Sequence, residues 1–97
     1  MNHVEVKELI EKLYKLYDEW QSPSYYGITT YYFAFMVGYK PYVVSVYEEK
    51  NRAKYYIIED ETKYISATTK SKTFEQDLRE LAKWSFTQTK YILHPSN

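Results

Sequence analysis

The longest uncharged run in the sequence, Ile28–Val37 (ITTYYFAFMV), constrains the fold more than any other segment. β-Branched and aromatic residues dominate it, and such side chains favour a pleated strand over a helix. Alternation along the strand places four large side chains on one side: Tyr31, Phe33, Phe35 and Val37. Because the opposite side is also largely apolar, we expect this strand to lie inside a sheet with both of its faces covered.

Three more strands are predicted after this run, at about residues 42–49, 53–59 and 63–69. Apolar residues alternate in the first of them, where Tyr42, Val44 and Val46 suit the same buried side. The segments between the strands are short and polar or contain turn residues, such as Gly38 and Pro41. Connections of this length join antiparallel neighbours, so the sequence predicts one antiparallel sheet of four strands.

An amphipathic helix is predicted at each end of the chain, at about residues 3–21 and 73–86. Asn2 with Glu5 forms a capping-box pattern before the first helix, and Thr73 with Gln76 repeats it before the second. Apolar residues then recur every three or four positions, which predicts one buried stripe on each helix. The expected stripes are Val6, Leu9, Ile10, Leu13, Leu16, Tyr17 and Trp20, and then Phe74, Leu78, Leu81, Ala82 and Ser85.

The fold class that follows is α+β, with the element order α-β-β-β-β-α in a single domain of 97 residues. Each helix has only one apolar stripe, so both are expected to pack on the same face of the sheet. Residues 87–97 form a C-terminal tail, in which Tyr91-Ile92-Leu93 is either a short extra strand or a packed segment.

Catalytic and metal-binding signatures are weak in this sequence. There is no cysteine, and the two histidines, His3 and His94, lie near opposite ends of the chain in polar surroundings. The acidic run Glu59-Asp60-Glu61 lacks the spaced ligands of a calcium loop and is more typical of a solvated turn. We therefore expect a non-enzymatic protein with no catalytic residues, no metal and no cofactor.

Location and origin are expectations from composition alone. Neither an apolar signal segment nor a membrane-spanning run is present, which predicts a cytoplasmic protein without membrane contact. The combination of thirteen tyrosines with two glycines resembles the small proteins of viruses and plasmids from hyperthermophilic archaea. That resemblance implies a viral or plasmid-encoded origin.

The second face of the predicted sheet is the main candidate for a binding surface. It is flat, aromatic and uncharged, and an exposed patch of that kind is typical of a protein interface. Its predicted members are Thr30, Tyr32, Ala34, Met36, Val43, Ser45, Tyr47, Tyr64, Ser66 and Thr68, with one tyrosine of the pair at 55 and 56. We expect a homodimer centred on Tyr32, Met36, Tyr47 and Tyr64, with an unidentified protein that it occludes or regulates as a further partner.

Two alternatives to this interface remain open at the sequence level. Residues 87–93 could cover the face within one chain, which would leave a monomer. The same tyrosines could also stack on the bases of a single-stranded nucleic acid, with Lys50, Arg52 and Lys54 near its phosphates. A net charge of zero makes nucleic acid the second choice.

Overall fold

A computed structural model describes residues 1–60, the backbone of 64–68, and residues 73–83. Its elements are α1 (His3–Leu13), β1 (Lys15–Gln21), β2 (Ile28–Val37), β3 (Lys40–Glu49), β4 (Arg52–Glu59), β5 (Tyr64–Thr68) and a helix over residues 73–83. Within these residues, no helix has the length and apolar character needed to cross a membrane.

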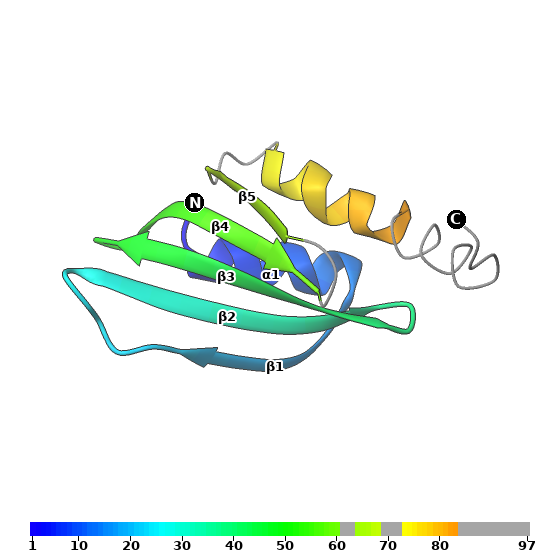
Figure 1. Cartoon of the computed structure of the whole chain (residues 1–97), viewed down its shortest axis with the longest axis horizontal. Coiled ribbons are helices and arrows are strands. Elements are labelled where there is room, and N and C mark those ends of the chain that lie inside the picture. Colours follow the sequence, from blue (N-terminus) through cyan, green and yellow to red (C-terminus); the bar gives the residue numbers. More distant parts are fainter. Residues whose placement is uncertain (61–63, 69–72, 84–97) are drawn as a thin grey trace.

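The strands form one open antiparallel sheet in the order β1-β2-β3-β4-β5, so each strand pairs with its neighbours in the sequence (Figure 1). The α+β class, the four hairpin-linked strands and the helix that follows them are confirmed. The sheet also has a fifth strand, β1, which pairs with the otherwise free edge of β2. The uncharged run that forms β2 is therefore an interior strand, as its two apolar faces predict.

The first helix begins where the sequence places it. The side chain of Asn2 accepts a hydrogen bond from the Glu5 amide at 3.0 Å, and the Glu5 carboxylate accepts one from the Asn2 amide at 3.1 Å. This capping box satisfies two amides that the first turn leaves without partners. Val6 and Ile10 are fully buried on one side of the helix, and their burial holds it on the sheet.

The prediction that the first helix continues to residue 21 is wrong. The helix ends at Leu13, and Tyr14 has the extended backbone of a strand. The same apolar residues also fit a strand, and pairing with β2 satisfies backbone groups along an edge that would otherwise lack partners. Leu16 still packs against the core, but Tyr17 and Trp20 are 55 % and 46 % exposed instead of buried in a helical stripe.

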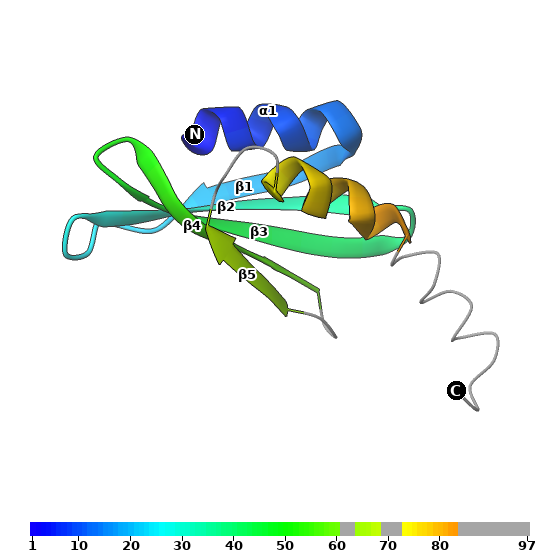
Figure 2. The same cartoon turned by 90° about the horizontal axis from the view of Figure 1, so that it is seen from above.

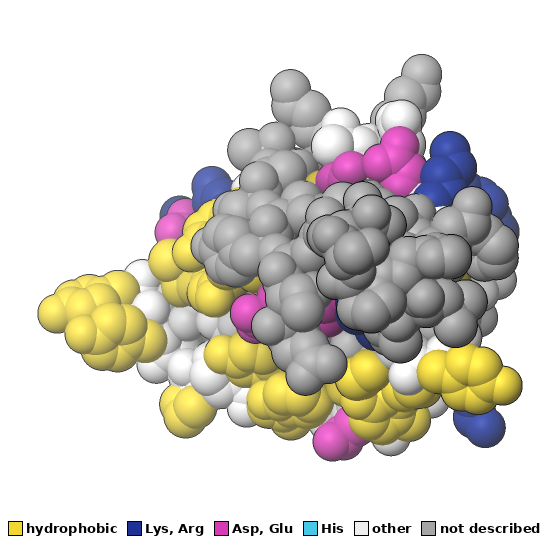
Figure 3. Space-filling model, turned by 45° about the vertical axis from the view of Figure 1, so that its right-hand side comes forward, with side chains coloured by type: hydrophobic (Ala, Val, Ile, Leu, Met, Phe, Trp, Pro, Cys, Tyr) yellow, Lys and Arg dark blue, Asp and Glu magenta, His cyan; other side chains and the backbone are white. Residues whose placement is uncertain are grey.

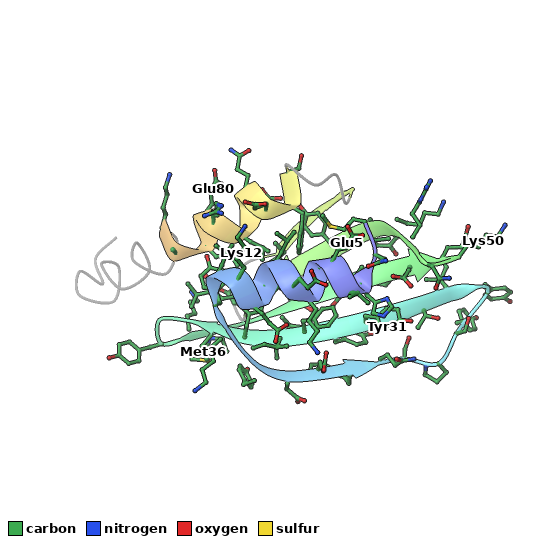
Figure 4. All side chains as sticks on the ribbon, turned by 180° about the vertical axis from the view of Figure 1, so that it is seen from behind. Glu5, Lys12, Tyr31, Met36, Lys50 and Glu80 are labelled. Atoms are coloured by element: carbon green, nitrogen blue, oxygen red, sulfur yellow. The ribbon has the colours of Figure 1, made fainter. Side chains whose placement is uncertain are left out.

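Both helices lie on one face of the twisted sheet (Figures 2 and 4). The core lies between the helices and the sheet. Phe33 and Phe35 are buried there, which confirms the predicted inward side of β2. Hydrophobic residues from both helices and from β2, β3 and β4 complete the core: Val6, Ile10, Val37, Tyr42, Val44, Val46, Ala53, Tyr56, Ile58, Phe74, Leu78 and Leu81.

The helix at 73–83 is attached to the sheet by polar as well as apolar contacts. The Tyr56 hydroxyl on β4 donates a hydrogen bond to the Asp77 carboxylate, and the Tyr56 ring meets Phe74 edge to face. Tyr14, at the end of α1, donates to the Leu78 carbonyl. These contacts connect the two helices, and residues 1–60 and 73–83 place no helix on the opposite face of the sheet.

Candidate functional site

The outer face of the sheet, opposite the two helices, is turned toward the viewer in Figure 1. No described helix or loop lies over it. Its members alternate with the core residues on β1 to β4: Lys15, Asp18, Trp20, Ile28, Thr30, Tyr32, Ala34, Met36, Val43, Ser45, Tyr47, Tyr55, Ile57 and Glu59. In Figure 3 hydrophobic side chains gather along the lower part of the molecule, where β1 and β2 run.

Four aromatic side chains, Trp20, Tyr32, Tyr47 and Tyr55, form a row across this face. Trp20 pairs with Tyr32 across β1 and β2, and Tyr47 pairs with Tyr55 across β3 and β4. Tyr32 pairs with Ser45, two residues before Tyr47, so these two tyrosines are diagonal neighbours. Diagonal neighbours on a sheet lie within reach of aromatic side chains. The row therefore crosses four strands without a gap in the pairing.

Within the row, rings stack face to face in pairs. The centroids of Trp20 and Tyr32 are 5.1 Å apart with 10° between the planes, and those of Tyr47 and Tyr55 are 4.3 Å apart with 15°. Parallel rings lying side by side in one plane cannot bring their centroids so close, so the rings stand upright on the sheet. One face of each ring is covered by its partner, and the row presents ring edges and hydroxyl groups to the outside.

Small side chains lie between these rings. Thr30, Ala34 and Ser45 are buried on the outer face, beside the larger side chains of the row. Lys15, Asp18 and Glu59 place the charges of the face on β1 and β4, and Glu49 adds one at the last residue of β3, away from the middle of the two central strands. The result is an uncharged centre with aromatic ridges over a low floor, which suits the packing of another apolar surface.

The predicted interface residues are partly brought together. Tyr32 and Tyr47 are the two central members of the aromatic row. Met36 shares the face but lies near the β2–β3 turn, opposite Lys15. The backbone of Tyr64 pairs with Glu59 on β4, and its side chain lies outside the described part of the chain.

The residue that sequence reasoning missed in this row is Trp20. It was assigned to the buried stripe of a long helix, whereas β1 carries it onto the outer face. The available signal was the crowding of aromatic residues after Leu13, namely Tyr14, Tyr17 and Trp20, because aromatic residues are enriched in strands. One of Tyr55 and Tyr56 was expected on the outer face. Tyr55 is the one that lies there, and Tyr56 faces the core.

The free edge of β1 is poorly suited to pairing with another strand. A β-bulge between Leu16 and Asp18 interrupts the ladder with β2. Lys15, Asp18 and Glu19 add charge along this short strand. Bulges and charges at a sheet edge disfavour edge-to-edge association, so the outer face is a better candidate for contact between chains than this edge.

The three basic residues of the alternative site lie in the β3–β4 hairpin, at one end of the sheet. Lys50, Arg52 and Lys54 are all exposed, and the Lys54 ammonium lies 3.8 Å from the Glu49 carboxylate. They are brought together by the hairpin, and Lys50 lies in its turn, at one end of the sheet (Figure 4).

His3 is not the solvated terminal histidine that its sequence context predicts. Its ring stacks on Tyr31 with centroids 3.7 Å apart, and its Nδ1 lies 2.8 Å from a carboxylate oxygen of Glu48, whose side chain is 3 % exposed. The His3 amide donates to the same oxygen at 2.8 Å. The buried carboxylate therefore caps the first turn of α1 and fixes the imidazole, which is a structural role.

A groove of about 430 Å³ lies beside His3, between α1 and β1. Its floor includes Tyr31 and Phe33, and an ion pair joins its sides at 2.8 Å between Lys7 and Glu19. Hydrogen bonding to Glu19 raises the pKa of Lys7, so the lysine keeps its charge at neutral pH. The groove contains no serine, threonine or cysteine that the histidine could activate.

Within the acidic run predicted as a solvated turn, Asp60 differs from the prediction, whereas Glu59 is exposed and Glu61 lies outside the described residues. The Asp60 side chain is buried and lies 3.0 Å from the Lys40 ammonium at the start of β3. This pair connects the β2–β3 turn to the end of β4. Among residues 1–60 and 73–83, no group of three or more acidic or histidine side chains could hold a metal ion.

No protein-family model matches the chain, and neither does any curated protein or solved structure. The functional proposals below rest on its own geometry.

Proposed function

We propose that this protein is a non-enzymatic binding protein that forms a symmetric dimer through the outer face of its sheet. The observation that carries the proposal is the aromatic row at the uncharged centre of a face that no described helix or loop covers. Trp20 and Tyr55 remain 46 % and 38 % exposed at the ends of that row. Large apolar surfaces of this kind cost free energy in water, and a second copy of the same face removes them from water.

The shape of the face supports contact with another protein surface. The row presents ring edges and hydroxyl groups, while Thr30, Ala34 and Ser45 form a low floor beside it. Ridges of one copy could pack against the floor of the other, as side chains interdigitate between two stacked sheets. The chain has a formal net charge of zero, so overall charge does not oppose association of two copies.

The wider role proposed with this dimer is to occlude or regulate another protein, in the cytoplasm. Single-stranded nucleic acid on the same face is the second candidate, supported by the exposed basic residues Lys50, Arg52 and Lys54. The stacking of the rings on one another disfavours it, because each ring of the row has at most one face left for a base.

Sedimentation velocity at micromolar concentrations tests the dimer. The unmodified protein should sediment as a dimer, and Tyr32→Glu with Tyr47→Glu should give monomers with unchanged circular dichroism. Burying two unpaired carboxylates should weaken association by at least about a hundredfold.

The matched control is Tyr25→Glu with Tyr39→Glu, which adds the same charges at exposed turn positions and should remain a dimer. A monomer for the unmodified protein would refute the proposal and favour coverage of the face by the chain itself. A dimer that persists in the Tyr32 and Tyr47 variant would place the interface elsewhere.

A further inference from the structure

Two hairpin turns at the same end of the sheet carry large side chains at the same unfavourable backbone position. The β1–β2 turn has Tyr26 at φ 50° followed by Gly27 at φ 77°, and the β3–β4 turn has Lys50 at φ 52° followed by Asn51 at φ 62°. Ile28, which closes the first turn, pairs with Glu49 beside the second. The two turns are therefore neighbours at one end of the molecule (Figures 1 and 2).

Both turns require left-handed backbone at their first central residue. Two-residue hairpin turns with two positive φ angles favour Asn or Gly there, because a larger side chain crowds the backbone in this conformation. Gly27 and Asn51 follow that preference at the second position, whereas Tyr26 and Lys50 depart from it at the first. In the described part of the chain, Lys50 forms no ion pair, and the ring contact of Tyr26 is with its neighbour Tyr25. Backbone strain that is retained in this way is typical of functional positions.

The exposed groups at this end have the chemistry of a stacking and anion-binding surface. Tyr25 and Tyr26 are 73 % and 86 % exposed, and their rings meet edge to face with centroids 4.4 Å apart. Unlike the rings of the aromatic row, these two do not cover each other face to face. Within the described residues, Lys50 and Arg52 are exposed and form no ion pair.

We infer that this end of the sheet binds single-stranded nucleic acid, with bases stacking on Tyr25 and Tyr26 and phosphates contacting Lys50 and Arg52. Proteins that bind single strands combine aromatic side chains with basic residues beside them in this way. The turn of residues 22–27, which projects at the left of Figure 3, has no aliphatic chain for insertion into a membrane. The site lies at the tips of the hairpins and does not depend on the proposed dimer.

Asparagine at the two turn positions separates binding from folding. Tyr26→Asn and Lys50→Asn each relieve the crowded backbone, so both variants should melt at the same temperature as the parent or higher. Binding is measured by fluorescence anisotropy with labelled DNA and RNA single strands of about 15 nucleotides, at about 50 mM salt. Tyr26→Asn should weaken binding about five- to a hundredfold, which is the range for loss of one stacked base.

Lys50→Asn should weaken binding and lower the slope of log affinity against log salt by about 0.7, as expected for the loss of one phosphate contact to a single strand. Tyr39→Asn is the matched control, because Tyr39 is an equally exposed tyrosine at the opposite end of the sheet, and it should bind as the parent does. Absence of binding by the parent, or unchanged affinity in the Tyr26 and Lys50 variants, would overturn the inference. Equal affinity for a duplex, or binding to vesicles containing phosphatidylserine but not to single strands, would overturn it as well.

Discussion

Replacing Tyr56 by phenylalanine tests how the helix at 73–83 is held on the sheet. The Tyr56 side chain is fully buried, and its hydroxyl donates to the Asp77 carboxylate while its ring packs edge to face on Phe74. Phenylalanine keeps the ring contact and removes only the hydrogen bond. A hydrogen bond to a charged acceptor contributes about 1.5–3 kcal/mol, so the free energy of unfolding should fall by about 2 kcal/mol. In a domain of this size that corresponds to about 8–15 °C in Tm.

The same hydroxyl gives the fold a dependence on alkaline pH. Burial, followed by the hydrogen bond to Asp77, raises the pKa of the Tyr56 phenol well above its ordinary value of 10.0. Above pH 10 the unfolded chain loses this proton while the folded chain keeps it, so the free energy of unfolding falls as pH rises. Urea denaturation at pH 7 and between about pH 9.5 and 11 should show a shallower alkaline decline for Tyr56→Phe than for the parent.

Tyr55→Phe is the control for this experiment. Tyr55 is the neighbouring tyrosine on the outer face, and loss of its partly exposed hydroxyl should change the free energy of unfolding by less than about 0.5 kcal/mol. Equal stability of Tyr56→Phe and the parent at pH 7 would refute the role assigned to the contact with Asp77.

Two further substitutions probe the core and the start of α1. Phe35→Ala should lower the free energy of unfolding, measured by urea denaturation, by about 3–5 kcal/mol, because the side chain is fully buried against Tyr14 and Tyr42. A decrease below about 1 kcal/mol would mean that this side of β2 contributes little to stability. Glu48→Ala should lower the free energy of unfolding by about 2–4 kcal/mol, because it leaves the His3 amide and imidazole without their hydrogen-bond acceptor. Unchanged stability would show that water replaces the carboxylate.

The sheet was predictable from the sequence because its signals are local. Alternation of β-branched and aromatic residues places the strand at 28–37 correctly, and the next two, predicted at 42–49 and 53–59, begin one or two residues earlier in the structure. The last strand was predicted at 63–69 and is described over 64–68; residues 63 and 69 lie outside the described residues. The second helix was predicted at 73–86 and is described over 73–83; Ser85 of its expected stripe and the tail at 87–97 lie outside the described residues.

Contacts between distant segments could not be predicted from the sequence, for a physical reason. His3 and Glu48 are 45 residues apart, and no local pattern shows that the carboxylate lies over the first turn of α1. The pairing of Lys40 with Asp60 likewise depends on the β2–β3 turn meeting the end of β4. Both contacts exist only once the sheet has assembled, so sequence context alone predicts solvated side chains at these positions.

The sequence predicted a helix where β1 (Lys15–Gln21) lies, and it did not predict Trp20 on the outer face. Both errors have one cause. The spacing of Leu13, Leu16 and Trp20 fits a helix, and this periodicity by itself predicts one through residue 21. In the folded chain the alternative is a strand that also satisfies the free edge of β2, and a helix continued to residue 21 would leave that edge unpaired. A strand places Leu16 over the core and Trp20 on the opposite face, beside Tyr32. The pairing that makes β2 an interior strand therefore also extends the aromatic surface on which the proposed dimer depends.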